Sequence, residues 1–217
     1  MKGLKEHLKT IAFRHFPSLS APRYAYGLDP SQLAFLVNAI SDRATTSGCI
    51  VEIGVARGMT TRFLAEHLIR QGIRKEYHAI DTFSSFTKDD LAYEKATRRK
   101  TSAELEGFSY NDFDIWKRNF RGFDLVHAHQ CDCKDFDFTK ISPVSVALLD
   151  VDLYIPTSKT LPKLYDALEL GGVILLDDVK AESAYDGARQ AYIEFCASRG
   201  LPQEIVGSKG GVIRRAT

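Results

Sequence analysis

Five short apolar runs, separated by stretches with helical character, constrain the fold of this 217-residue chain more than any other feature. The runs occupy residues 49–53, 77–80, 125–128, 144–149 and 173–176, and helical character is found between them at residues 61–71 and 158–170. Runs of this length, rich in Val and Ile, are typical of strands covered on both faces. Strands that alternate with helices form a parallel sheet with crossover helices, so the chain is predicted to be an α/β protein.

The carboxyl end departs from this alternation. Residues 204–207 and 211–214 are short apolar segments on either side of Ser208-Lys209-Gly210, which suits a hairpin connection. Together with the five runs they predict a seven-stranded, mostly parallel sheet that ends in an antiparallel C-terminal hairpin.

Two segments lie outside this pattern. Residues 1–47 are predicted to form an N-terminal helical cap on the α/β domain of residues 48–217. The cap has two helical stretches around a break at residues 16–22, and the second starts with Asp29 as its N-cap and Pro30 at the first helical position. Residues 83–120 are longer than an ordinary connection and are predicted to form a lid, with a helix over residues 88–103. We expect residues 98–100, Arg-Arg-Lys, on a solvated face of that helix.

The charge balance, the apolar segments and the cysteine pattern indicate which partners and which compartment to expect. The formal net charge of +1 gives no electrostatic footprint for nucleic acid. The start of the chain lacks the apolar core of a signal peptide, and no stretch approaches the roughly 18 apolar residues of a membrane span. The four cysteines form no C-x-x-C pair, which favours free thiols in a reducing cytosol. We expect a cytoplasmic protein without nucleic-acid or membrane partners, and leave a homo-oligomer open.

A glycine-containing loop follows the first predicted strand. Glu52, Gly54 and Gly58 precede a helix, with the glycines spaced as G-x-x-x-G. Ala56 stands where a dinucleotide fingerprint would have its middle glycine, which disfavours a nicotinamide dinucleotide. Asp81 closes the second predicted strand, where a carboxylate can accept both ribose hydroxyls of an adenosine ligand. The loop and Asp81 together predict an adenosine site.

Acidic doublets end two successive strands. Asp150 and Asp152 follow residues 144–149, and Asp177 and Asp178 follow residues 173–176. If these strands are neighbours, their ends lie about 4.8 Å apart. Crowded carboxylates either retain protons or bind a cation, and their hard oxygens suit magnesium, manganese or calcium. Such a cation can lower the pKa of a substrate hydroxyl, and a remaining carboxylate can act as general base. The alternative is that these aspartates are helix caps or solvated side chains.

The chain resembles class I S-adenosylmethionine-dependent methyltransferases from about residue 48 to the end, which have a Rossmann-like fold. Its D-x-D-L-Y-x-x-T and G-G-x-x-x-x-D-D motifs resemble those of the macrocin O-methyltransferase family, whose members methylate sugar hydroxyls of natural products. The resemblance implies that Gly54 and Gly58 make room for the methionine part of the cofactor, and that Glu52 contacts its amino group or supports the loop. It also implies that Asp150, Asp177 and Asp178 are magnesium ligands. Asp152 would be the catalytic base.

These inferences predict an S-adenosylmethionine-dependent O-methyltransferase, assisted by Mg²⁺ or another hard divalent cation. Its acceptor is expected to be a small-molecule hydroxyl, on a sugar or a glycosylated natural product. A catechol-type aromatic O-methyltransferase is the nearest alternative. A nicotinamide-dependent oxidoreductase and a non-catalytic binding module are more distant ones.

Overall fold

A computed structural model describes residues 2–16, 23–181 and 183–216 of the chain. Its core is a seven-stranded sheet with the strand order β3-β2-β1-β4-β5-β7-β6. The strands are β1 (Cys49–Ile53), β2 (Tyr77–Asp81), β3 (Val126–Gln130), β4 (Val144–Leu149), β5 (Leu168–Leu176), β6 (Glu204–Val206) and β7 (Gly210–Arg214). Strands β1 to β5 pair in parallel, whereas β7 is antiparallel to both β5 and β6. The predicted mostly parallel sheet with its C-terminal hairpin is confirmed.

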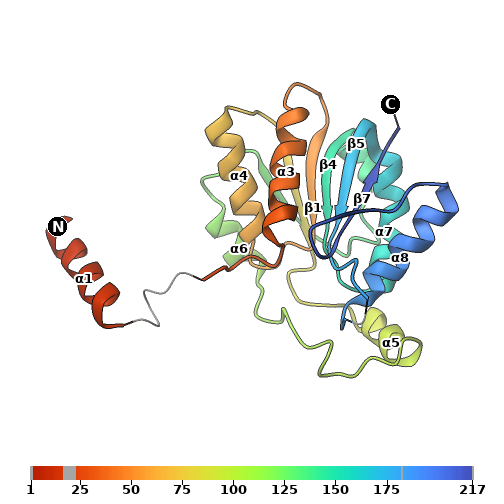
Figure 1. Ribbon diagram of the computed structural model, residues 1–217, viewed down its shortest axis with the longest axis horizontal. Coiled ribbons are helices and arrows are strands. Elements are labelled where there is room, and N and C mark those ends of the chain that lie inside the picture. Colours follow the sequence, from red (N-terminus) through yellow and green to blue (C-terminus); the bar gives the residue numbers. More distant parts are fainter. Residues whose placement is uncertain (1, 17–22, 182, 217) are drawn as a thin grey trace.

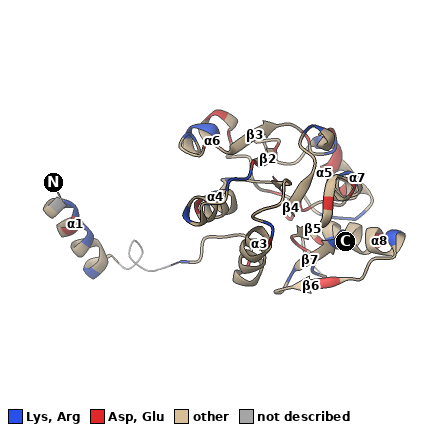
Figure 2. Ribbon diagram, turned by 90° about the horizontal axis from the view of Figure 1, so that it is seen from above, with Lys and Arg blue, Asp and Glu red and all other residues tan. Residues whose placement is uncertain are grey.

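Helices cover both faces of the sheet (Figures 1 and 2). One face carries α3 (Pro30–Asp42) and α4 (Met59–Gln71), and the other carries α7 (Tyr154–Ala167) and α8 (Asp186–Arg199). The remaining helical segments are α1 (Lys2–His15), α5 (Lys88–Ala96), α6 (Phe113–Asn119) and the short 3₁₀ turn η1 (Phe138–Lys140).

Each face of the sheet has its own apolar core. Leu36 and Leu64 pack from α3 and α4 against strand residues such as Leu148. On the opposite face, Leu161 of α7 and Phe195 of α8 belong to a separate buried cluster. Because successive side chains of a strand point to opposite faces, strands buried on both sides need apolar residues at nearly every position. This explains why the strands are visible in the sequence as continuous runs.

The amino-terminal helices differ in their surroundings. As predicted, Asp29 caps α3: its carboxylate accepts from the Gln32 N–H, and the Gln32 side chain accepts from the Asp29 N–H, both at 2.9 Å. Helix α3 then packs on the sheet beside α4 (Figure 1). Helix α1 stands apart, and its side chains from Gly3 onward are exposed except for Ala12. Most of the predicted break, residues 17–22, lies outside the described residues, and the domain boundary at residue 47 stays a prediction.

The insert is less helical than the sequence indicates. Helix α5 ends at Ala96 instead of residue 103, and Arg99 has a φ of 60°, which no α-helix accommodates. Arg99 is exposed as expected, but the solvated face is wrong for Arg98 and Lys100, whose side chains contact Asp186 at 2.6 and 3.0 Å. Arg98 and Lys100 thus tie the end of α5 to the start of α8.

The parallel strands bring their carboxyl ends to one edge of the sheet. The order reverses between β1 and β4, which lie side by side although they are far apart in the sequence. In open α/β sheets this switch point is where ligands bind. Both the glycine-containing loop and the acidic doublets follow strands at this edge.

Within the described ranges, no helix combines the length and apolar character required to cross a membrane.

Candidate active site

Gly54 follows the end of β1 and lies against Asp150, which follows the end of β4. It has a φ of 83°, and a Cβ built on it would lie 1.7 Å from the backbone oxygen of Asp150. The N–H of Asp150 in turn donates to the carbonyl of Ile53 at 2.8 Å. Only glycine satisfies both the left-handed backbone and this contact.

Gly58 has a different role from Gly54. It is the left-handed N-cap of α4, with a φ of 82°. A Cβ there would lie 2.6 Å from the Phe120 ring and 2.9 Å from Nε1 of Trp116. Gly58 thus lets α4 begin against the stacked rings of Trp116 and Phe120. It does not line either of the two pockets described below.

Glu52 lies buried beneath the loop. Its Oε2 accepts from the hydroxyls of Thr61 and Tyr77, each at 2.5 Å. Burial raises the pKa of the Glu52 carboxyl to about 7. The side chain therefore ties β1 to α4 and β2, and it also lines the second of the two pockets.

Asp81 connects the loop to the end of β2. Its Oδ2 accepts from the N–H groups of Val55 and Ala56 at 2.8 and 3.1 Å, and its Oδ1 accepts from the Phe83 N–H at 2.6 Å. Each carboxylate oxygen has two lone pairs, so Asp81 retains acceptor capacity toward a ligand.

Two adjoining pockets open at this edge of the sheet. The first is a half-open cleft, with Asp81, Asp132 and Ile80 in its wall. The second reaches Glu52 on one side and Asp177 and Asp178 on the other. Both are lined by residues at the β1 and β4 ends, which are Gly54, Ala56, Asp150 and Asp152. A ligand can therefore extend from the β2 and β3 ends to the acidic doublets.

The acidic doublets meet as the sequence predicts, because β4 and β5 are neighbours. Asp150, Asp177 and Asp178 each offer a carboxylate oxygen within 4.8 Å of the others. Asp152 lies beside them and is 8% exposed. Asp152 and Asp178 have φ values of 62° and 58°, a left-handed backbone that costs energy outside glycine and is typical of functional sites.

The crowding of the cluster disfavours the charged forms of its carboxyl groups. Burial, and then the neighbouring Asp177, raise the pKa of Asp150 well above its usual range. Burial and the proximity of Asp178 do the same for the pKa of Asp152. Three hard oxygen donors that repel one another at short range suit Mg²⁺ or Mn²⁺, and the donor set fits such an ion.

Sequence reasoning missed two residues that contact the cluster. Lys209, in the β6–β7 turn, places its Nζ 2.6 Å from Asp177 Oδ2 and 2.9 Å from Asp178 Oδ1. Gln32 of α3 donates from Nε2 to Asp177 Oδ1 at 2.7 Å. Burial opposes the charge of Lys209, but the two carboxylates raise the pKa of its ammonium. In the sequence, Gln32 stands out only as the last residue of a D-x-x-Q pattern. That pattern predicts the capping of α3 and does not indicate a contact with Asp177.

Comparisons with known proteins identify the family. A family model for macrocin O-methyltransferases, TylF, matches residues 21–210. The chain belongs to the macrocin O-methyltransferase family. It is an S-adenosylmethionine-dependent O-methyltransferase, as the motifs predicted. No curated protein sequence matches the chain.

Solved structures agree with the fold. The O-methyltransferase NovP is similar with a TM-score of 0.68 and 22% identity, over 86% of this chain and 80% of that one. The calicheamicin methyltransferase CalS11 has a TM-score of 0.65 and 14% identity, over 98% and 90% of the two chains. An O-methyltransferase from Bacillus cereus in complex with SAH has a TM-score of 0.54 and 17% identity, over 100% and 91%. At these identities the likeness concerns the fold alone.

Proposed function

We propose that this O-methyltransferase transfers a methyl group to a sugar hydroxyl of a small molecule, with help from a divalent cation. The observation that carries the proposal is the position of the acidic cluster. It adjoins the pocket at the glycine-containing loop, and Asp150 and Asp152 line both pockets.

The methyl donor would occupy the first pocket and extend into the second. In this arrangement Asp81 accepts one ribose hydroxyl on Oδ1 while its Oδ2 holds the loop amides. Gly54 allows the methionine part to pass close to the backbone, and Glu52 supports the loop from below. Gly58 contributes by fixing the start of α4. Asp132, at the end of β3, faces the same pocket and is placed for the adenine end.

The second pocket would hold the acceptor. Asp150, Asp177 and Asp178 would hold the cation, which would supply Lewis-acid chemistry that lowers the pKa of the acceptor hydroxyl. Asp152 is the general base that takes the hydroxyl proton as the oxygen attacks the sulfonium methyl group. The new O–CH₃ bond forms while the S–CH₃ bond breaks, leaving S-adenosylhomocysteine. Positioning of donor and acceptor supplies much of the rate enhancement.

A sugar acceptor is supported by the family and by one structural neighbour. The apo structure of CalS11 is described as that of a TDP-rhamnose 3'-O-methyltransferase, and it has a TM-score of 0.58 and 16% identity over 98% of this chain and 93% of that one. We therefore infer a deoxysugar, free or attached to a larger molecule, as the class of acceptor.

An acceptor panel tests the proposal. The purified chain is incubated with S-adenosylmethionine and either TDP-rhamnose, a rhamnosylated aglycone or a catechol, and S-adenosylhomocysteine is quantified. We expect product with a sugar acceptor in Mg²⁺ and about a hundredfold less in EDTA, because cation assistance contributes several kcal/mol. Turnover of the catechol alone would favour the aromatic alternative, and full activity in EDTA would contradict the role of the cation.

Lys209 provides a second test, because its ammonium competes with a divalent cation for Asp177 and Asp178. Replacing Lys209 with Met removes the charge but keeps an unbranched side chain. We expect Mn²⁺ to bind the variant about tenfold more tightly in a calorimetric titration. Lys180→Met, an exposed lysine close to Asp178 in the chain, is the matched control and should bind as the wild type does. Equal affinities in the two variants would contradict this competition.

A further inference from the structure

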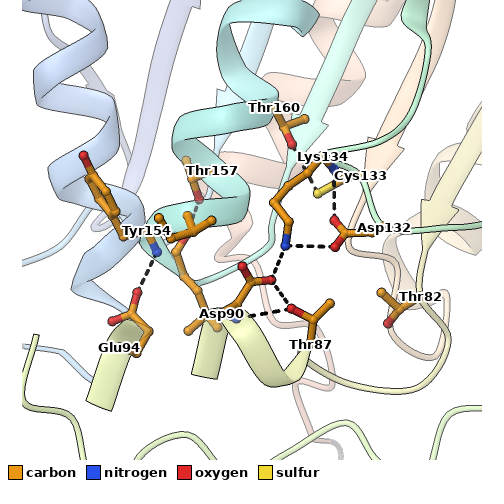
Figure 3. A network of polar contacts seen from close by, with 12 residues as sticks. Thr82, Thr87, Asp90, Glu94, Asp132, Cys133, Lys134, Tyr154, Thr157 and Thr160 are labelled. Carbon is orange, nitrogen blue, oxygen red and sulfur yellow. Dashed lines mark hydrogen bonds and ion pairs between the residues drawn. The ribbon is translucent and has the colours of Figure 1, made fainter. Parts of the chain in front are cut away.

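Helix α7 starts directly after the D-x-D turn and receives its cap from a distant helix. Its N-cap residue is Leu153, whose apolar side chain cannot accept a hydrogen bond. The N–H of the next residue, Tyr154, donates instead to Oε1 of Glu94 at 2.8 Å (Figure 3). Glu94 belongs to α5 in the insert. Its carboxylate therefore satisfies a helix N-terminus and faces the positive end of the helix dipole.

The carboxylate of Glu94 is buried and forms an ion pair with Arg98. It is 1% exposed, and Nε of Arg98 lies 2.9 Å from its Oε2. Arg98 also donates to Asp186 at the start of α8 at 2.6 Å. A Cβ on Gly187, the next residue of α8, would lie 2.5 Å from the Tyr154 nitrogen and 3.0 Å from Glu94 Oε1. Helix α8 thus packs directly against the cap.

The other end of α5 is tied to the segment that follows β3. Asp90, one turn before Glu94, accepts from Nζ of Lys134 at 2.5 Å and from the Thr87 hydroxyl at 2.6 Å (Figure 3). Lys134 also contacts Asp132 at 2.8 Å, and Asp90 and Asp132 both line the pocket. Two buried acids on one face of α5 therefore link the β3 end to the start of α7.

The turn that this cap holds is under backbone strain. Asp152 has a φ of 62°, and the N–H of Leu153 folds back to the Val151 carbonyl at 2.5 Å. The carbonyl of Asp152 accepts from the Ala188 N–H of α8 at 3.2 Å. A strained backbone persists only where the surrounding structure holds it. The cap on Tyr154, two residues after Asp152, is a contact that can do so.

We infer that Glu94 is a positioning residue that caps α7 from the insert and thereby holds Asp152 in place for proton transfer. The inference rests on the proposed function, in which Asp152 is the general base. It gives the insert a role in assembling the site, in addition to lining the first pocket.

Three variants test the inference. Glu94→Ala removes the cap, Glu94→Gln keeps an oxygen acceptor near Tyr154, and Asp89→Ala is the matched control because Asp89 is an exposed acid on the same helix. For Glu94→Ala we expect about tenfold faster hydrogen exchange at the Tyr154 amide. Glu94→Gln and Asp89→Ala should keep the slow exchange of the wild type. The capping role would be overturned if the Tyr154 amide exchanged at the wild-type rate in both Glu94 variants. It would also be overturned if exchange were equally fast in Glu94→Ala and Glu94→Gln.

Turnover on the sugar acceptor tests the link to Asp152. We expect Glu94→Ala to lower kcat about tenfold or more, with the affinity for S-adenosylhomocysteine within threefold of the wild type. In an Asp152→Asn background the same substitution should have no further effect, because Glu94 acts through Asp152. Multiplicative losses in the double variant would overturn the inference. A wild type that binds neither S-adenosylhomocysteine nor Mn²⁺ would instead refute the proposed function, while the exchange result would still decide the cap.

Discussion

Replacing Asp152 with Asn is expected to lower the rate of methyl transfer by about 10²- to 10⁴-fold, the usual contribution of a general base. Asn is a close isostere and tolerates the left-handed backbone that Asp152 adopts. Because burial and nearby carboxylates already disfavour the charge of Asp152, its removal should not destabilise the fold. The substitution therefore isolates proton transfer from folding.

Initial rates on the best acceptor of the panel, together with calorimetric titration of S-adenosylhomocysteine, measure this effect. The affinity for S-adenosylhomocysteine should stay within about threefold of the wild type, since a change below 1 kcal/mol is expected. Asp42→Asn, at the exposed end of α3, is the control and should retain full activity. An Asp152→Asn protein with undiminished turnover would contradict the role of Asp152 as the base. It would also revive the idea of a binding module with no catalytic use for this residue.

Replacing Gly54 with Ala is expected to weaken binding of S-adenosylmethionine by about a hundredfold or more and to lower the free energy of unfolding by about 3 kcal/mol. The added Cβ would stand 1.7 Å from the Asp150 carbonyl oxygen, so the ends of β1 and β4 must separate. Both the loop and the acidic cluster would shift as a result.

Gly72→Ala is the matched control for this prediction. Gly72 has a φ of 65°, but among the described residues nothing lies within 4 Å of the added Cβ. It therefore carries only the cost of a left-handed alanine, about 1–2 kcal/mol, and should bind the methyl donor normally. Thermal unfolding and calorimetry distinguish the two glycines. Equal stability and equal affinity in both variants would show that the contact between Gly54 and Asp150 is unimportant.

The features that were predictable from sequence are those set by local rules or by strand ends. The capping of α3 by Asp29 follows from residues three positions apart, and Pro30 marks the same boundary. The gathering of Asp150 with Asp177 required only that two successive parallel strands be neighbours, which β4 and β5 are. In both cases short-range chemistry or sheet geometry determines the outcome.

Features that depend on tertiary packing were not predictable. Gln32 and Asp177 are 145 positions apart, and Lys209 is 32 positions from Asp177, so no local pattern connects them. Arg98 looks like one of three solvated cations in the sequence, yet it pairs with Glu94 and α8 because the insert folds against that helix. The packing of Gly58 against the α6 rings likewise depends on a segment some 60 residues away.

The central claim is that an acidic cluster beside the methyl-donor pocket binds a divalent cation. Calorimetric titration of Mn²⁺ into the purified wild-type chain, saturated with S-adenosylhomocysteine, tests it most directly. We expect one Mn²⁺ site per chain, and its loss in Asp177→Ala because that substitution removes one of the three converging carboxylates. A chain that takes up S-adenosylhomocysteine but shows no heat of Mn²⁺ binding would contradict the claim.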